Sequence, residues 1–169
     1  MESVESTTGR AETAIPAGDL FDDLSFLLAR ANALSLAAGN AALSACGLRV
    51  RSYSVLALAA EERRPSQREL AELLRLDPSQ VVALVDELQA RDLVSREPDP
   101  RDRRANVVTA TDAGVALYAE STMAVAVAQE EVFGGLSRAQ RGDLATLLRV
   151  IAMPDPSGEA SRPPADRRE

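Results

Sequence analysis

The chain has 169 residues, of which 46% are hydrophobic, and a net charge of −7 at pH 7. This length fits one domain with a real apolar core, and no apolar run reaches the roughly 18 to 20 residues that a membrane helix needs. One Cys and no His exclude an internal disulfide, a Ser-His-Asp triad and a Cys-His pair. Without a signal-peptide pattern either, we expect a soluble cytoplasmic protein that is not an enzyme and has no cofactor or metal site.

The negative charge is unevenly distributed. Residues 47–104 hold 11 Arg and 11 acidic residues and are neutral, whereas residues 1–46 and 105–169 are acidic. Any nucleic-acid binding by the middle of the chain must therefore come from the placement of a few Arg side chains, because bulk charge does not supply it.

The first helix follows a segment with no periodicity. Residues 1–17 are polar and predict a mobile tail, so the folded domain is expected over 18–153. Leucines and alanines at helical spacing predict a helix from Asp19 to about Ser44, ended at Gly47. Because it is apolar on several sides, this helix needs more than one partner.

A second helix comes next, followed by the first helix and the turn of a predicted helix-turn-helix unit. A helix over Arg49 to about Glu61 is broken by Arg63-Arg64-Pro65, and Ser66 with Glu69 forms a capping box for the first helix of the helix-turn-helix. We expect a buried stripe in that helix and a turn after it; the stripe is Leu70, Leu73 and Leu74, and the turn is Arg75-Leu76.

The second helix of this unit has a clear inner and outer face. Asp77 and Pro78 suit its first turn, and its apolar face combines Val81, Leu84, Val85 and Leu88. Ser79, Ala83 and Asp86 fall opposite that face. This is the arrangement of a helix that enters the major groove of DNA.

A small β-wing follows the second helix. Residues 93–96 and 106–109 predict two strands, with Pro98 and Pro100 interrupting their pairing. The loop between them carries Arg101, Asp102, Arg103 and Arg104. The predicted fold is therefore mainly α with a small β-wing, a winged helix-turn-helix over about 48–110.

Two helices close the domain. Thr111 caps a long helix that is apolar on nearly all sides and ends at Gly134-Gly135, and Ser137 caps the last one. Its apolar side is Leu144, Leu147, Leu148 and Ile151. Pro154 ends the fold, and residues 154–169 predict a second disordered tail.

The sequence resembles the MarR family of bacterial winged helix-turn-helix transcriptional regulators across residues 48–116. The matching segments are 69–71, 77–81, 84–88, 99–105 and 111–114, and the most specific is Asp102-Arg103-Arg104 at the wing tip. Arg75 and Asp92 stand where the family often has Gly, and Ala83 stands where it often has a basic or polar residue. The resemblance implies a homodimer held by helices over about 18–46 and 111–153.

Candidate DNA contacts fall into three groups. Side chains for base edges are Ser79, Gln80, Val82 and Ala83. By the resemblance, Arg104 enters the minor groove, held by Asp102, with Arg101 and Arg103 beside it. Phosphate candidates are Ser66, Gln67, Arg68 and Arg75, and less specifically Arg51 and Ser52. A solvated helix face and a solvated charge run remain the alternatives.

The resemblance also implies a small aromatic or phenolic effector. Asn40, Leu43, Tyr53 and Leu56 are the expected lining, with ordinary core packing as the alternative. Cys46 is expected to be a small buried thiol. The predicted function is a ligand-responsive repressor that binds a pseudo-palindromic operator in double-stranded DNA, away from any membrane. An effector-free architectural protein and a protein-interaction module that has lost DNA binding are the alternatives.

Overall fold

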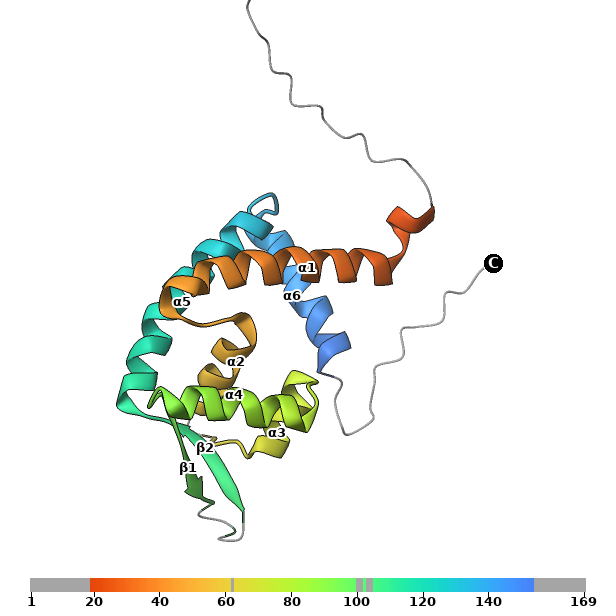
Figure 1. The fold of residues 1–169 in the computed structure, drawn as a ribbon. Coiled ribbons are helices and arrows are strands. Elements are labelled where there is room, and N and C mark those ends of the chain that lie inside the picture. Colours follow the sequence, from red (N-terminus) through yellow and green to blue (C-terminus); the bar gives the residue numbers. More distant parts are fainter. Residues whose placement is uncertain (1–18, 62, 100–101, 103–104, 154–169) are drawn as a thin grey trace, which may run out of the picture. The chain divides into compact units, whose positions relative to one another are not determined.

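The computed structural model describes residues 19–61, 63–99, 102 and 105–153 (Figure 1). The chain divides into two compact units, residues 1–34 and residues 35–169, and each is described by itself. The tails expected over 1–17 and 154–169, and wing residues Arg101, Arg103 and Arg104, lie outside the described residues.

Residues 19–34 of the first unit are helical, with a break that the sequence did not predict. A 3-10 helix spans Asp19–Asp22, and α1 (Leu24–Leu43) begins after it. The carboxylate of Asp23 accepts a hydrogen bond from the Phe26 N–H at 2.7 Å. This side chain supplies the partner that an N-cap normally gives to the first turn, so the expectation of one continuous helix from Asp19 is wrong.

The expectation that no segment is long and apolar enough for a membrane is also wrong. Leu24–Cys46 has 23 residues and a mean hydropathy of 1.2, so by length and composition alone it could cross a membrane. Only 11% of its most apolar 18-residue stretch is buried inside the protein. Leu24 is 82% exposed and Leu34 is 54% exposed, so much of this apolar surface has no partner within the chain as described.

The second unit is built around a core of aliphatic side chains. After α1 comes a 3-10 turn, Ser44–Cys46, closed by Gly47 in a left-handed conformation, φ 62°, and then α2 (Val50–Ala59). Val55 and Leu56 of α2 are fully buried. The remaining fully buried large side chains come from the elements around α2: Leu43, Leu70, Val81, Val85, Leu88, Val94, Val107 and Val108.

The helix-turn-helix consists of α3 (Gln67–Leu74) and α4 (Pro78–Ala90). The turn passes through Arg75 at φ 51°, a left-handed conformation that L-residues adopt at a cost. Leu70 is buried, but Leu73 is 50% exposed and Ala71 is buried in its place. At 100° per residue the inner face centres on Leu70, Ala71 and Leu74, and Leu73 falls about 100° away from that centre, so the expectation that Leu73 is buried is wrong.

The β-wing is a two-stranded antiparallel sheet of β1 (Val94–Pro98) and β2 (Asn106–Ala110). Pro98 is the last paired position, opposite Asn106, so it ends the ladder and does not interrupt it. Its missing N–H is tolerated there because the strand pairs on one side only. The Val108 N–H also donates to the Pro65 carbonyl at 2.8 Å, which attaches the wing to the segment before α3.

The end of α4 is anchored to two other elements. Arg91 donates to the carbonyls of Gly47, at 2.7 Å, and Cys46, at 3.1 Å. Asp92 turns the chain at φ 58°, and its carbonyl accepts from the Thr111 hydroxyl at 2.6 Å. Cys46 itself is half-buried against the core.

The last two helices are α5 (Asp112–Phe133), capped by Thr111, and α6 (Arg138–Ala152), capped by Ser137. Gly114 lets α5 start directly against the wing, because a Cβ there would lie 1.9 Å from the Leu93 carbonyl oxygen. No residue of α6 is buried, and Leu147 and Ile151 are 64% and 68% exposed.

Candidate nucleic-acid interface and effector pocket

The outer face of α4 carries the four side chains predicted to meet base edges. Ser79, Gln80 and Ala83 are exposed, and Val82 is 42% exposed. The opposite face is locked into the core by Val81, Val85 and Leu88, none of which is exposed. The helix therefore presents a fixed row of small, polar and methyl-bearing groups, the kinds that pair with base edges in the major groove.

The first turn of α4 is fixed by its cap. The Asp77 carboxylate accepts from the Ser79 N–H at 2.8 Å and from the Ser79 hydroxyl at 2.5 Å. These hydrogen bonds favour the charged form and lower the pKa of Asp77 below its ordinary value. Because the hydroxyl hydrogen of Ser79 points at Asp77, this side chain offers acceptor lone pairs outward.

The predicted phosphate contacts differ in whether their side chains are already hydrogen-bonded within the protein. The Ser66 hydroxyl and N–H both pair with Glu69 in the capping box, and the Gln67 amide oxygen accepts from Arg96 at 2.7 Å. Arg68 is exposed and pairs with Glu72 one turn along, at 2.9 Å. Arg75 is exposed at the turn. Ser52 is 2% exposed and bonds to Arg49, so it is not available to a phosphate.

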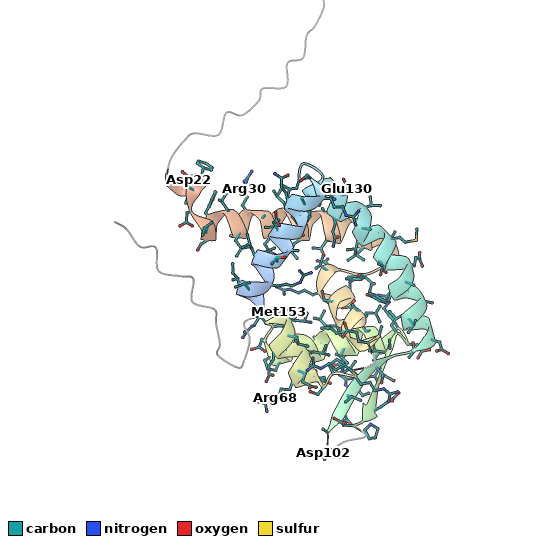
Figure 2. All side chains as sticks on the ribbon, turned by 180° about the vertical axis from the view of Figure 1, so that it is seen from behind. Asp22, Arg30, Arg68, Asp102, Glu130 and Met153 are labelled. Carbon is teal, nitrogen blue, oxygen red and sulfur yellow. The ribbon has the colours of Figure 1, made fainter. Side chains whose placement is uncertain are left out.

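Asp102 is the wing-tip candidate that the structure describes. It is exposed, and its carbonyl accepts from the Ala105 N–H at 2.9 Å. Figure 2 places Asp102 at the end of the hairpin and Arg68 on α3, both at the end of the unit away from Glu130. The roles predicted for Arg101, Arg103 and Arg104 stay predictions, because these residues lie outside the described part of the chain.

Arg96 of β1 was missed by the sequence analysis. It donates to Gln67 on α3 and to Asp86 and Gln89 on α4. The alternation of inward and outward side chains along the strand could have indicated this role of Arg96. Arg96 has the same parity along the strand as the buried Val94, so a charged side chain there needs polar partners from neighbouring elements.

Two of the four predicted effector residues line a pocket of about 210 Å³ between the end of α1, α2 and α5. These are Leu43 and Tyr53. The Asn40 side chain instead accepts from the Val50 N–H at 2.9 Å, and Leu56 is a fully buried core residue. The remaining lining residues are Ser35, Gly39, Val50, Ser54, Val125, Ala128 and Gln129.

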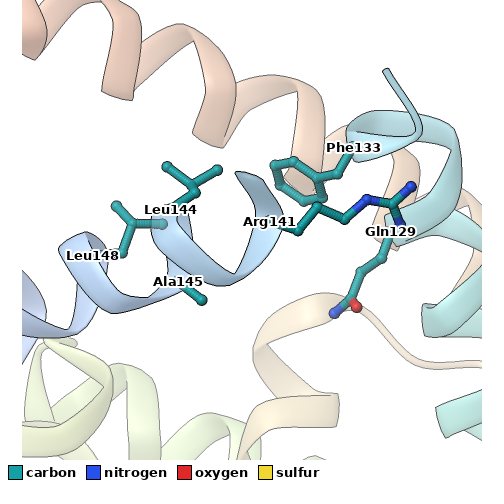
Figure 3. Close-up of a pocket in the computed structure, with 6 residues that line it drawn as sticks. All are labelled: Gln129, Phe133, Arg141, Leu144, Ala145 and Leu148. Carbon is teal, nitrogen blue, oxygen red and sulfur yellow. The ribbon is translucent and has the colours of Figure 1, made fainter. Parts of the chain in front are cut away.

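A second pocket of about 250 Å³ lies between α5 and α6 (Figure 3). Its walls are mostly apolar, with Phe133, Leu144 and Leu148 on them. Arg141 borders it, but its guanidinium is held by Glu130 at 2.5 and 2.9 Å. This ion pair lowers the pKa of Glu130 and raises that of Arg141.

Comparison with known proteins decides the family. The MarR family model matches residues 47–105. The repressor NicR of Pseudomonas putida, an HTH-type transcriptional repressor, is 32% identical over 109 residues, which cover 63% of this chain and 69% of NicR. The chain belongs to the MarR family of transcriptional regulators.

Solved MarR-family structures share the fold over most of their length. CouR from Rhodococcus jostii RHA1, bound to p-coumaroyl-CoA, is 43% identical with a TM-score of 0.75, over 82% of this chain and 97% of that one. A CouR repressor bound to a 23-mer DNA duplex is 29% identical with a TM-score of 0.72, over 82% of this chain and 98% of that one. The mainly helical fold with its small β-wing is thus confirmed.

Proposed function

We propose that this MarR-family regulator represses transcription as a homodimer on a pseudo-palindromic operator and releases it when a small aromatic effector binds. The observation that carries this proposal is the outer face of α4. Ser79, Gln80, Val82 and Ala83 are exposed on a helix whose other face is buried, and a similar repressor is known bound to a DNA duplex. We further propose that the protein is cytoplasmic and has no catalytic activity.

The exposed apolar surfaces support the homodimer. On α5 and α6, Met123, Val127, Leu147, Val150 and Ile151 are each between 64% and 75% exposed, and the apolar pocket of Figure 3 opens between the same two helices. Apolar patches of this kind mark interaction surfaces. We propose that a second copy of the chain covers this surface of α5 and α6, since two-fold symmetric dimers present two recognition helices to successive major grooves.

The α1–α2–α5 pocket is the proposed effector site. At about 210 Å³ it is smaller than the roughly 300 to 1,000 Å³ of sites for drug-sized ligands. It therefore suits a single aromatic ring, either a free phenolic compound or the aryl end of a larger molecule. The p-coumaroyl-CoA bound by a relative that is 43% identical has such an aryl end.

The DNA proposal is tested by footprinting the purified protein on its own upstream region, with a shuffled duplex of equal composition as competitor. Two protected half-sites about one helical turn apart would support a dimer that reads sequence. Equal affinity for both duplexes would favour the architectural alternative. No binding to either duplex at low salt would favour the protein-interaction module.

The effector proposal is tested by adding p-coumaroyl-CoA, or 4-hydroxycinnamate, to the protein–operator complex. We expect release of the DNA, and we expect Val125→Phe to abolish release because the larger ring fills the pocket that Val125 lines. Val115→Phe is the matched control, since Val115 is 48% exposed on the same helix and does not line this pocket. Release that survives Val125→Phe would place the effector elsewhere.

A further inference from the structure

Arg96 joins three elements of the winged helix-turn-helix (about residues 48–110, here called the winged unit) through one guanidinium group. Its Nε donates to the Gln67 Oε1 at 2.7 Å, its Nη2 donates to the Asp86 Oδ1 at 2.5 Å, and its Nη1 donates to Gln89. Gln67 opens α3, Asp86 and Gln89 lie on α4, and Arg96 itself lies on β1 opposite Val108. All three guanidinium nitrogens thus have a partner inside the protein.

This arrangement is more protected from solvent than the two Arg–carboxylate pairs described at Arg64 and Arg68. The Arg96 side chain is 25% exposed, against 88% for Arg68 and 50% for Arg64. The Arg68 pair also lies within a single helix, so it fixes nothing between elements. A planar guanidinium with several simultaneous hydrogen bonds is geometrically demanding, so Arg96 fixes the position of α4 against α3 and β1.

The first consequence concerns Gln67. Because its amide oxygen is held by Arg96, its NH2 group is the end directed to other partners. Gln67 is the first residue of α3, where helix N–H groups also point outward. Arg96 therefore orients Gln67 as a donor, which is the polarity that a phosphate oxygen requires.

The second consequence concerns Asp86. This carboxylate lies on the outward side of α4, with Ser79 and Ala83, and its side chain is 60% exposed. An uncompensated negative charge there would repel the phosphates on either side of the major groove. The 2.5 Å contact with Arg96 neutralises it locally.

We propose that Arg96 is a positioning residue for DNA recognition, which holds α4 against α3 and β1 and neutralises Asp86 on the DNA-facing side. It does so without touching DNA itself. The proposal rests on DNA binding through α4. A direct phosphate contact by Arg96 is the competing explanation.

A salt series on four proteins separates the two explanations: wild type, Arg96→Ala, Asp86→Ala and the double variant. We expect Arg96→Ala to weaken operator binding roughly tenfold, in the range of measured couplings within hydrogen-bonded networks. The slope of log affinity against log salt should stay unchanged, because no phosphate contact is lost. In the Asp86→Ala background the same substitution should cost several-fold less, because the charge that needs neutralising is gone.

Arg68→Ala is the matched control, since Arg68 is an exposed phosphate candidate in the same unit. Loss of a phosphate contact should lower the salt slope by about one. If Arg96→Ala lowers the slope by about one and costs the same with or without Asp86, Arg96 contacts phosphate and the proposal is overturned. Unchanged affinity in Arg96→Ala overturns it as well.

Arg96→Lys covers the case in which Arg96→Ala does not fold, as judged by circular dichroism. Lys keeps the charge but cannot donate from three separate nitrogens. We expect it to weaken binding at an unchanged slope, and wild-type affinity would overturn the proposal. A wild-type protein that binds no duplex would refute the DNA-binding proposal itself, a result visible before any variant is made.

Discussion

The winged unit and the last two helices use apolar side chains in opposite ways. In α4, Val81, Val85 and Leu88 are completely buried, so the recognition helix is held by a core that one chain supplies. In α6 no residue is buried, although Leu147 and Ile151 are as apolar as any core residue. The first region is structurally self-sufficient, whereas the second is built to be completed by another surface.

The capping hydrogen bonds do not differ in the same way. Ser66 with Glu69 begins α3 and Ser137 with Gln140 begins α6, each through a reciprocal capping box. Local hydrogen bonding therefore specifies where both helices begin. The two helices differ only in how much of their apolar surface is buried by the rest of the chain. This is why a helix start can be read from sequence more securely than the surface that the helix packs against.

The largest expected effect is on the self-sufficient core. Leu88→Ala should lower the free energy of unfolding by about 2 to 5 kcal/mol, because it leaves a cavity at a position with no exposed surface. Val82→Ala, on the outer face of the same helix and 42% exposed, should change it by about 0.5 kcal/mol or less. Urea unfolding of both variants measures the difference, and equal losses would contradict the assignment of the two faces.

The next largest effect is expected from a substitution on the exposed apolar surface of α6. Leu147→Glu should convert the protein from dimer to monomer at micromolar concentration, because a carboxylate is costly to bury in an apolar interface. Analytical ultracentrifugation measures the mass. Arg149→Ala, two residues along the same helix, is the control and should remain dimeric. A monomeric wild type, or a dimeric Leu147→Glu, would show that α6 is not the interface.

A smaller effect tests the capping chemistry. Ser66→Ala removes the hydroxyl that accepts from the Glu69 N–H, and it should lower the free energy of unfolding by about 1 kcal/mol. Ser25→Ala, an exposed position in the first turn of α1, should have an effect within about 0.5 kcal/mol. Thermal or urea unfolding measures both, and equal losses of stability would contradict the capping role of Ser66.

The smallest effect is a dependence of stability on pH. The pKa of Asp77 is lowered below its ordinary value of 3.8 by its hydrogen bonds to Ser79. A lowered native pKa gives stability that is present above the unfolded-state pKa and is lost as the pH falls through the native one. Unfolding of wild type and Asp77→Asn between pH 7 and pH 2 should therefore show the wild type losing more stability below about pH 4. Parallel curves would contradict this role for the carboxylate.

Much of the second unit follows from local patterns in the sequence. The capping box at Ser66, the cap at Asp77 and the left-handed turn at Arg75 are all fixed by residues close in the chain. The inner face of α4 follows from its helical spacing. Where several residues competed for one face, the prediction was wrong: Leu73 is 50% exposed because Ala71 lies nearer the centre of the buried side.

What the sequence did not predict depends on contacts between distant residues. Arg96 reaches Gln67, which is 29 positions earlier, and Arg91 reaches Gly47, which is 44 positions earlier. Such partners follow from the tertiary arrangement and from no local spacing. The residues predicted to line an effector site show the same limit, since Leu43 and Tyr53 line the α1–α2–α5 pocket while Leu56 belongs to the core.

The most direct test of the account compares wild type and Gln80→Ala on operator and shuffled DNA at one salt concentration, by fluorescence anisotropy. Gln80 is exposed on the outer face of α4, and its amide can pair with an adenine edge. We expect the substitution to weaken operator binding by about 1 to 3 kcal/mol and to leave binding to the shuffled duplex unchanged. An equal loss on both duplexes, or no loss on the operator, would contradict base readout by Gln80 on this face.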